Sequence, residues 1–429
     1  MDEERHIRLC DFGFARAVET RGRASTVCLP VDHELLSSRG WLDCAAYLRL
    51  AATDPELRLA TYDAAADALR LERPLGHQLH APQAGRELVQ LGEEAAWAAG
   101  GGDLCYRATA DHRLFVQPGE LPRDGCFAPF AAMPCKVPAG EVLAAGLAVR
   151  HVTAARNGVA ADPEASWREP GMPCTAERDA EAAFLALCGF WLLRGRRCGD
   201  AQVRFATASV AESAWVHQQL ARCGLAASAV SRGAGHVHVA DEGWACCLGP
   251  PSVIESAEEG GRPRRAGAWL WRCGAAECRA VLAGVQRAAG GSECAIAVVG
   301  EELRDDLVRL LLMAGRSAAF ERLPDGSYRL EHSGCEAAAR PVLPAAAIGR
   351  VESPGAVWCV EMPSGLLWAR RARRDAETGR VVQVRAAARA PVVTRADSGR
   401  TGVAAGSDGQ LRHALLQRAR GAGGQAVRR

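Results

Sequence analysis

The chain has 429 residues, which is enough for two or three globular domains with cores of their own. Its 52 basic and 50 acidic residues leave a formal charge of +2, which argues against a surface that attracts nucleic acid or membrane everywhere. No apolar run approaches the roughly 20 residues that span a bilayer, so we expect no membrane partner.

The cysteines favour an intracellular protein, cytoplasmic or nuclear. All 17 are scattered along the chain without any Cys-x-x-Cys pair. Residues 1–8 are rich in charged side chains, and no apolar signal core follows them. Neither the adjacent Cys246 and Cys247 nor the pair Cys273 and Cys278 has the usual spacing of zinc ligands. We therefore predict reduced thiols and no structural metal site.

The first 27 residues differ from the rest of the chain. The run Ile7–Arg16 resembles the Asp-Phe-Gly segment of a Ser/Thr protein kinase, in which the aspartate holds Mg²⁺. The Gly-rich loop, the strand lysine and the His-Arg-Asp loop of kinases are missing from the sequence, so a genuine kinase is the weakest interpretation. We interpret residues 1–27 as a fragment of a host protein.

Residues 28–152 are predicted to be rich in short strands. Short apolar runs alternate there with Gly, Asp and Pro, as in Leu104–Gln117 and Ala145–Val152. Residues 153–179 lack apolar periodicity and contain several turn-forming dipeptides, which is typical of a linker. We expect a domain boundary in this linker.

Residues 180–325 carry an approximate α-β-α repeat. An apolar helix, a strand and an amphipathic helix occur in the first copy, and the same order begins again at Glu277. The predicted elements are Ala180–Leu193, Gln202–Thr207, Val210–Cys223, Val230–Cys247, Glu277–Ala289, Cys294–Val299 and Glu301–Ala314. Such an internal repeat predicts a pseudo-two-fold domain.

The last part of the chain returns to strand-like patterning. Within residues 343–393 the clearest feature is a strand pair over Val357–Ala369, on either side of Pro363-Ser364-Gly365. Residues 394–429 are rich in Gly, Ala and Arg, so we predict a disordered basic tail.

Three short blocks carry a resemblance to a known family. They are Cys28-Leu29-Pro30-Val31-Asp32, Thr109-Ala110-Asp111-His112 and Val357-Trp358-Cys359-Val360. In this order they resemble the signature blocks of inteins and hedgehog-type autoprocessing domains. The resemblance implies a β-rich Hint fold whose halves, residues 28–152 and 343–393, are split by an insertion.

The resemblance also implies roles for four residues. The thiol of Cys28 would attack the preceding carbonyl and convert an amide into a thioester. Thr109 would orient and polarise the scissile amide, and His112 would give a proton to the leaving amine. Cys359 falls where the family carries an Asp or Cys that supports this chemistry. Packed structural thiols are the simpler interpretation of Cys28 and Cys359.

The downstream junction departs from the family pattern. Inteins end in His-Asn or a near equivalent whose amide cyclises, whereas the only asparagine here is Asn157, in the predicted linker. Pro391-Val392-Val393 stands where that block should be, followed by Thr394 as a candidate acceptor hydroxyl. Because valine cannot cyclise, we expect complete splicing to be lost and the N-to-S acyl shift at Val27–Cys28 to be the most that is retained.

Two predicted helices resemble the paired helices of LAGLIDADG (DOD-type) homing endonucleases. They are Phe184–Gly195 and Val281–Gly290, and in the family each ends in a carboxylate that holds a divalent metal for phosphodiester cleavage. The corresponding residues are Arg194 and Ala289, which offer no metal ligand. We therefore predict that endonuclease activity is lost. An active endonuclease would need Mg²⁺, and we expect no other cofactor.

The sequence leaves other functions open. The partners of the autoprocessing element would be its own flanking peptide segments. The main alternative is a catalytically silent relic of a homing endonuclease that binds double-stranded DNA through arginines on its sheet faces. A third interpretation is an inert product with no selected activity.

Overall fold

The fold is described from a computed structural model of the chain. The structure describes residues 28–94, 105–119, 134–160, 178–198, 202–225, 230–241, 266–290, 295–332, 342–374, 381–384 and 392–395, except Thr153, Ala234 and Pro354, together with Trp167 and Trp244. The predicted host fragment, residues 1–27, and the predicted tail beyond residue 395 lie outside the described residues.

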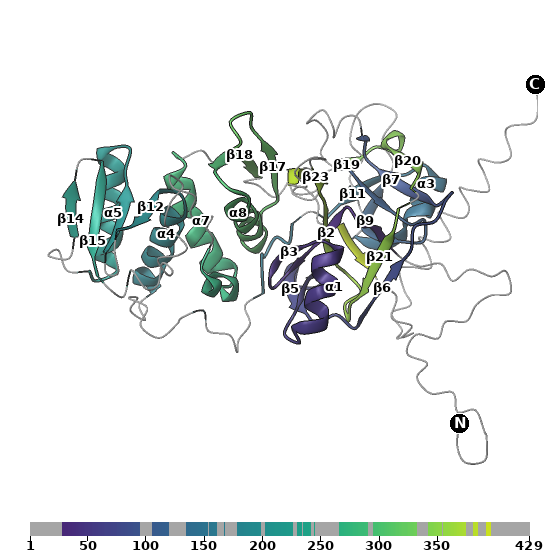
Figure 1. Cartoon of the computed structure of the whole chain (residues 1–429), viewed down its shortest axis with the longest axis horizontal. Coiled ribbons are helices and arrows are strands. Elements are labelled where there is room, and N and C mark those ends of the chain that lie inside the picture. The colour runs from purple at the N-terminus through teal and green to yellow at the C-terminus, as the bar shows by residue number, and fades with distance from the viewer. Residues whose placement is uncertain are drawn as a thin grey trace, which may run out of the picture.

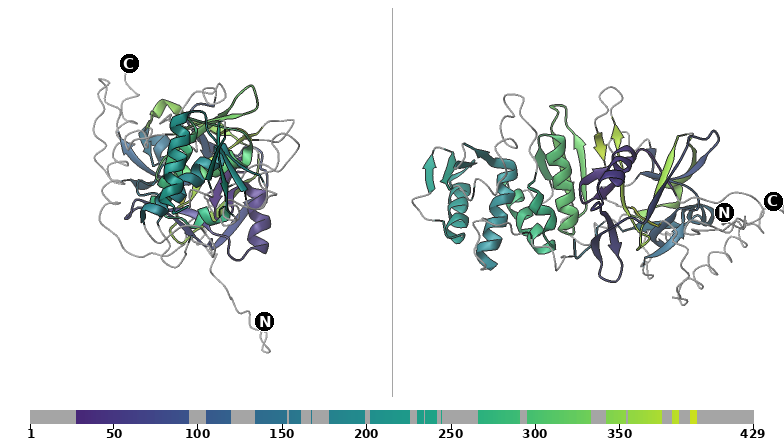
Figure 2. Two further views of the ribbon diagram at one scale, coloured as in Figure 1. Left: turned by 90° about the vertical axis from the view of Figure 1, so that its left-hand side faces the viewer. Right: turned by 60° about the horizontal axis from the view of Figure 1, so that its bottom comes forward.

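Two lobes lie side by side along the long axis of the molecule (Figures 1 and 2). The split lobe contains the described residues of 28–160, 342–371 and 392–395, and the insert lobe contains those of 178–332. Strands are frequent in both, and the strand-rich class predicted from the sequence is confirmed at this coarse level.

The described residues of the split lobe form short strands and the helices α1 (Cys44–Thr53) and α3 (Ala139–Ala145). Its N-terminal strands are β1 (Leu29–Pro30), β2 (His33–Ser37), β3 (Gly40–Leu42), β4 (Leu59–Asp63), β5 (Ala68–Glu72), β6 (Gly76–His80), β7 (Glu87–Leu91), β8 (Tyr106–Ala108), β9 (Arg113–Gly119), β10 (Cys135–Pro138) and β11 (Ala148–His151). Its C-terminal part adds β19 (Val342–Leu343), the 3₁₀ turn Ala345–Ala347, β20 (Ile348–Glu352), β21 (Val357–Glu361), β22 (Trp368–Arg371) and β25 (Val392–Arg395).

The helices α1 (Cys44–Thr53) and α3 (Ala139–Ala145) were not predicted from the sequence. The helix α1 begins with a side-chain cap, because the Asp43 carboxylate accepts the Ala46 N–H at 2.8 Å. Gly146 ends α3 with a left-handed backbone, φ +59°, which glycine adopts without strain. The cap at Asp43 and the glycine at residue 146 fix where α1 begins and where α3 ends. The short apolar runs, on which the prediction of strands was based, do not indicate these helices.

The two chain segments of the split lobe pair with each other. Strand β1 lies against β21, β2 against β22, β7 against β20 and β9 against β25, and all of these pairings are antiparallel. The strands β21 and β22 therefore form as predicted but do not pair with each other. The strand β21 belongs to the sheet that contains β1, and β22 belongs to the sheet that contains β2. The chain therefore passes from one sheet to the other between β21 and β22, just as it does between β1 and β2.

The insert lobe repeats one order of elements. The first copy is α4 (Arg178–Arg194), β12 (Gly195–Arg197), β13 (Gln202–Ala206), α5 (Val210–Arg222), β14 (Val230–Gly233) and β15 (His236–Ala240). After the 3₁₀ turn Ala268–Arg272, the second copy is α7 (Ala275–Ala288), β16 (Ala295–Val298), α8 (Glu301–Met313), β17 (Ala318–Arg322) and β18 (Tyr328–His332). The strand order β13-β15-β14 in one sheet matches β16-β18-β17 in the other. This repeat extends beyond the predicted end at residue 325.

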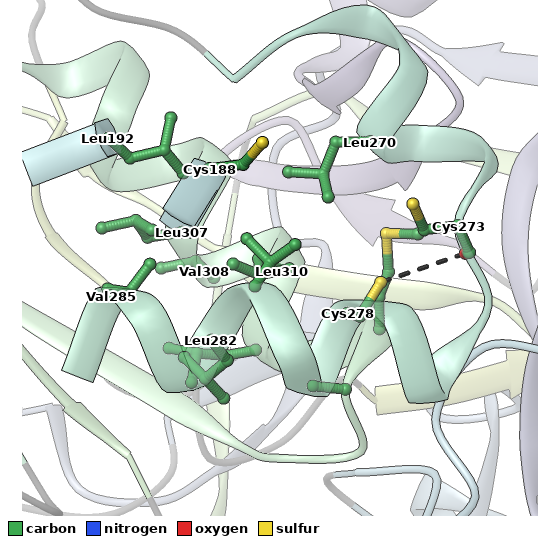
Figure 3. Packing of buried hydrophobic residues seen from close by; sticks show 14 of the residues in the cluster. Cys188, Leu192, Leu270, Cys273, Cys278, Leu282, Val285, Leu307, Val308 and Leu310 are labelled. Atoms are coloured by element: carbon green, nitrogen blue, oxygen red, sulfur yellow. Dashed lines mark hydrogen bonds between the residues drawn. The ribbon is translucent and has the colours of Figure 1, made fainter. Parts of the chain in front are cut away.

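The long helices α4 and α7 touch through their glycines. A Cβ atom on Gly189 would overlap the carbonyl of Val281, and one on Gly284 would overlap the carbonyl of Ala186. The backbones of the two helices are therefore in direct contact at Gly189 and at Gly284, because glycine has no side chain to separate them. Figure 3 shows the apolar packing around these helices, with Cys188, Leu192, Leu282, Val285, Leu307 and Leu310 among the side chains drawn.

The lobes share a buried charge network and a sheet. Arg370 on β22 is only 1% exposed, and it donates to Glu34 at 2.7 Å and to Asp305 on α8 at 3.1 Å. Arg304 donates to the same Asp305 at 3.0 Å. In addition, β23 (Arg373–Arg374) and β24 (Val381–Val384) leave the split lobe and extend the insert sheet through β17.

Part of the predicted linker is packed between the lobes. Residues 154–160 contact both the β4–β5 turn and the end of α8, because Asn157 N–H donates to the Asp67 carbonyl and Val159 N–H to that of Met313. The helix α4 begins at Arg178, inside the range 153–179 predicted as linker. The segment 154–160 is thus a structural contact and not a free tether.

We predict that Gly189→Ala destabilises the protein by about 1–3 kcal/mol, because the added methyl group forces the α4 and α7 backbones apart. Helix propensity alone would give the opposite sign, a gain of about 1 kcal/mol. Urea unfolding measures the difference. Gly355→Ala is the control, since a Cβ atom there meets open space. A stabilised Gly189→Ala variant would show that the helices are not in contact.

Candidate functional site

Cys28, the residue just before β1, lies opposite Cys359 on β21. Leu29 on β1 is paired with Trp358 on β21, and the two strands are antiparallel. Cys28, which precedes Leu29, therefore faces Cys359, which follows Trp358. Cys28 is completely buried, whereas Cys359 is half-buried. Two of the residues predicted from the family blocks are thereby brought together by the pairing of distant chain segments.

Thr109 holds the backbone of Cys28 from both sides. The Cys28 N–H donates to the Thr109 hydroxyl at 3.0 Å, and the Thr109 N–H donates to the Cys28 carbonyl at 3.2 Å. The hydroxyl therefore lies at the amide nitrogen that follows Val27. That nitrogen must gain a proton if the bond between Val27 and Cys28 breaks.

His112 ends the same short turn as Thr109. Its N–H donates to the Thr109 carbonyl at 2.9 Å, and its own carbonyl accepts the Ala139 N–H at 2.8 Å. His112 is only 2% exposed, and neither ring nitrogen has a hydrogen-bond partner among the described residues. Burial, helped by the nearby His33, lowers the pKa of His112 to about 3. The imidazole is therefore neutral at pH 7 and has one N–H to offer.

The environment of Cys359 favours its thiolate. A hydrogen bond from Cys28 lowers the pKa of Cys359, and this effect outweighs burial, which raises it. Cysteines elsewhere behave differently. The Cys278 thiol, which contacts the Cys273 carbonyl at 3.9 Å in Figure 3, lies in an apolar core where burial raises its pKa to about 12. Cys359 is thus set apart from such packed thiols.

A second polar network lies beside the site on β2 and β22. Asp32 accepts from the His33 ring at 2.8 Å and from Arg371 at 2.8 Å. Burial raises the pKa of Asp32, but the charges and hydrogen bonds of His33 and Arg371 together hold it below its ordinary value. Arg371 also donates to Glu94 at 2.7 Å. This network fixes β2 and β22 next to the segment that carries Cys28.

Thr394 lies on β25, beside the strand that follows His112. Its backbone is paired with Leu114, and Arg395 is paired with Arg113. The candidate acceptor segment therefore approaches the turn that contains Thr109 and His112, although its sequence position is 285 residues away from Thr109. The strand β25 also includes Thr394 and Arg395, which were predicted to begin the disordered tail.

Arg194 and Ala289 lie at the C-terminal ends of the paired helices. The Arg194 side chain donates to the Ala288 carbonyl at 3.0 Å, and Ala289 is the residue that caps α7. A cation at helix C-termini is electrostatically favourable because the free carbonyls there carry partial negative charge. The guanidinium thus satisfies the end of the helix, and its positive charge would repel a metal ion at this point.

His80 is a residue of the site that the sequence did not reveal. It lies at the end of β6, which pairs with β21 on the side opposite β1. Its ring comes so close to Cys28 and Cys359 that one donor atom from each lies within 4.8 Å of the others. Only the pairing of β6 with β21 creates this group, so no local motif could have predicted it. We had expected no metal site.

The comparisons with known proteins add no family. No protein-family model matches the chain, and no curated protein matches it closely enough to count as a relative. Among the helices that the structure describes, none is long and apolar enough to cross a membrane.

Acid should destabilise the protein through its buried histidines. His151, which lies beside Tyr106, is fully buried and has a pKa lowered to about 3 by burial, against about 6.5 when unfolded. Its contribution to stability is complete above pH 6.5 and is lost as the pH falls toward 3, because only the unfolded state binds the proton. At pH 5 the loss is about 2 kcal/mol.

We expect His151→Gln to reduce the difference in unfolding free energy between pH 7 and pH 5 by this amount, measured by urea titration. Tyr106→Phe is the control, because it alters the same contact without removing a group that titrates in this range. An unchanged difference in the His151 variant would contradict the assigned burial.

Proposed function

We propose that this protein is an intein-like autoprocessing element that carries out an N-to-S acyl shift at Val27–Cys28. The observation that carries the proposal is the double hydrogen bond between Cys28 and Thr109, with Cys359 on the facing strand. A packed structural cysteine would not require a threonine hydroxyl on its own amide nitrogen.

The chemistry can be written with the protons balanced. The Cys359 thiolate accepts the proton of the Cys28 thiol, and the Cys28 sulfur attacks the Val27 carbonyl carbon. The carbon–nitrogen bond then breaks, a thioester forms, and the Cys28 nitrogen leaves as an amine. His112, which is neutral at rest, gives its ring proton to this amine. The proton held by Cys359 returns through solvent to His112, so the net change is the transfer of the Cys28 thiol proton to the leaving nitrogen.

The reaction should end in cleavage and not in splicing. Val393 stands where the family has a cyclising asparagine, and valine has no side-chain nucleophile. Thr394 lies on a strand beside the site, but without cyclisation the downstream peptide bond has no release step. A thiol or water then takes the acyl group from Cys28.

The insert lobe is best explained as a degenerate LAGLIDADG domain. Its repeated order of elements and the glycine contacts between α4 and α7 support this proposal. Arg194 at the helix ends argues against a bound metal ion there and so against DNA cleavage.

Incubation with excess thiol should remove residues 1–27 from the full chain, as measured by intact-mass spectrometry. Cys28→Ala should abolish the loss, and Thr109→Ala should slow it by about 100-fold, because the hydroxyl no longer orients the amide nitrogen. Cys198→Ala is the matched control, since this thiol is exposed and outside the site. An intact wild-type chain in a folded sample would refute autoprocessing.

A second candidate function is DNA binding by the first insert sheet. Arg196 is paired with Arg204, and Arg204 with His238, so two arginines and a histidine form a row across three strands. These side chains are partly or fully exposed, whereas the alternating Val203 and Phe205 are buried. The second sheet differs, because there Arg329 is paired with Glu331 at 3.5 Å.

Arg204→Glu should weaken binding to duplex DNA at 50 mM salt by about 10-fold and reduce the salt dependence by about one phosphate contact, in fluorescence anisotropy titrations. Arg329→Glu, on the sheet with neutralised charge, is the control and should have less effect. Equal effects of the two variants, or no binding by the wild type, would rule out a phosphate-binding surface on the first sheet.

A further inference from the structure

His80 lies on the same face of a small sheet as the two thiols of the site. In the sheet β1-β21-β6, Cys359 is paired with Gln78 on β6, and His80 follows two residues later. Residues two apart on a strand point to the same face, and a long side chain reaches its diagonal neighbour on the next strand. One donor atom each from Cys28, His80 and Cys359 lies within 4.8 Å of the other two. Both thiols are thus close to one imidazole.

The His80 ring has a nitrogen that is available for a proton. Its Nε2 is buried and has no hydrogen-bond partner among the residues that the structure describes. A buried polar atom without a partner costs free energy, so such an atom calls for an explanation. His80 as a whole is only half-buried, and β6 is the end strand of this sheet in the described part of the chain. A proton taken up by the ring can therefore pass to water.

The charged groups around His80 come from several elements. On β21, the Glu361 carboxylate lies on the same face as the thiol two residues before it, and its charge raises the pKa of Cys359. Before β7, the Arg86 guanidinium donates to the backbone carbonyl of the residue after His80 at 3.0 Å. On β6 itself, His77 lies on the opposite face. One carboxylate therefore acts on the thiol, and one guanidinium lies beside the imidazole.

The described strands behind the thiols present apolar side chains to them. Leu88 on β7 and Val351 on β20 are paired with each other and pack against Cys28 and its neighbours. The charged Glu87 and Arg350 on the same two strands bond each other at 2.7 Å. The thiols are therefore packed against an apolar wall, which offers no acceptor for a proton.

We propose that His80 is the base that removes the proton from the pair of thiols and passes it to water. Its part in the reaction rests on the proposed function. When the Cys28 sulfur has attacked the Val27 carbonyl, its former proton is on the Cys359 sulfur. The proton then moves from Cys359 to His80, so that a sulfur–hydrogen bond breaks, a nitrogen–hydrogen bond forms and Cys359 is again a thiolate. The imidazolium of His80 gives the proton to water.

This transfer favours the forward reaction. If the thioester reverts, the Cys28 sulfur is the leaving group and needs a proton, which a protonated Cys359 would supply at once. Transfer to His80 and to water removes that acid. A proton moves directly between atoms about 2.6–3.2 Å apart, or through one water, and such distances are often longer at rest. The upper limit of 4.8 Å leaves room for a small ring rotation or one bridging water.

The role in cleavage is tested by chemical rescue. The full chain is incubated with saturating hydroxylamine, which captures the thioester at Cys28 and releases residues 1–27 as a hydroxamate, and intact-mass spectrometry follows the release. We expect His80→Ala to slow the release at pH 7 by about 10- to 100-fold. Added imidazole should speed the variant by about 5-fold or more, and this gain should grow with pH as imidazole loses its proton. A merely structural role of His80 gives no such rescue.

Three further variants make the rescue specific. His77→Ala removes an imidazole that contacts Tyr47 on the other face of the same strand, and Cys198→Ser removes an exposed thiol elsewhere. Both should release residues 1–27 at the wild-type rate, with no response to imidazole. His80→Gln keeps a polar side chain without a base, so it should be slow although its thermal melting is unchanged. Wild-type rates in the His80 variants, or no rescue, would overturn the proposal.

A second measurement needs no cleavage. Iodoacetamide reacts with the thiolate and not with the thiol, so its rate of reaction with Cys359, followed by peptide mass mapping, reports proton removal from this residue. We expect His80→Gln to slow the reaction at about pH 6.5 by about 5-fold or more, and to change it little near pH 9, where hydroxide removes the proton. The same change at both pH values would indicate altered access and overturn proton transfer to His80. If the wild type does not cleave, the proposed function fails, and the alkylation ratio alone decides whether His80 takes the proton.

Discussion

The antiparallel pairing of residues 28–37 with residues 357–371 is the constraint on which the rest of the structure depends. Strand β1 must lie against β21 before Cys28 can face Cys359, and the same pair of segments continues as β2 against β22. The bond between Glu34 and Arg370 joins residues 336 positions apart. Closing such a long loop costs only slightly more than closing a shorter one, because the entropy grows with the logarithm of length. A folded insertion between the partners is therefore tolerated.

Strand alternation gives this pairing two separate roles. Neighbouring residues on a strand point to opposite faces, so Arg370 and Arg371 on β22 serve different partners. Arg371 binds Asp32 and Glu94 next to the segment that carries Cys28. Arg370 binds Glu34 and Asp305 at the contact with the insert lobe. The position of the insert and the geometry of the site thus depend on the same strand.

The sequence predicted those elements whose signals are local. The helices α4, α7 and α8 follow from their apolar patterns in the sequence. Motif order indicated that Cys28, Thr109 and Cys359 would meet. The structure adds what depends on distant pairing: β21 and β22 belong to different sheets, and His80 reaches the thiols only because β6 lies against β21. The low pKa of His112 likewise comes from burial, which a motif does not reveal.

The buried contact between Arg370 and Asp305 has a consequence for deletion of the insert lobe. An inserted lobe without contacts to the rest of the chain could be deleted without harm, but this one supplies a partner of a cation that is only 1% exposed. Removing one partner of a buried ion pair costs about 3–5 kcal/mol. A domain stable by about 5–15 kcal/mol would lose a large part of that in a single deletion. The stability of the split lobe thus depends on the insert lobe, whatever else the insert lobe does.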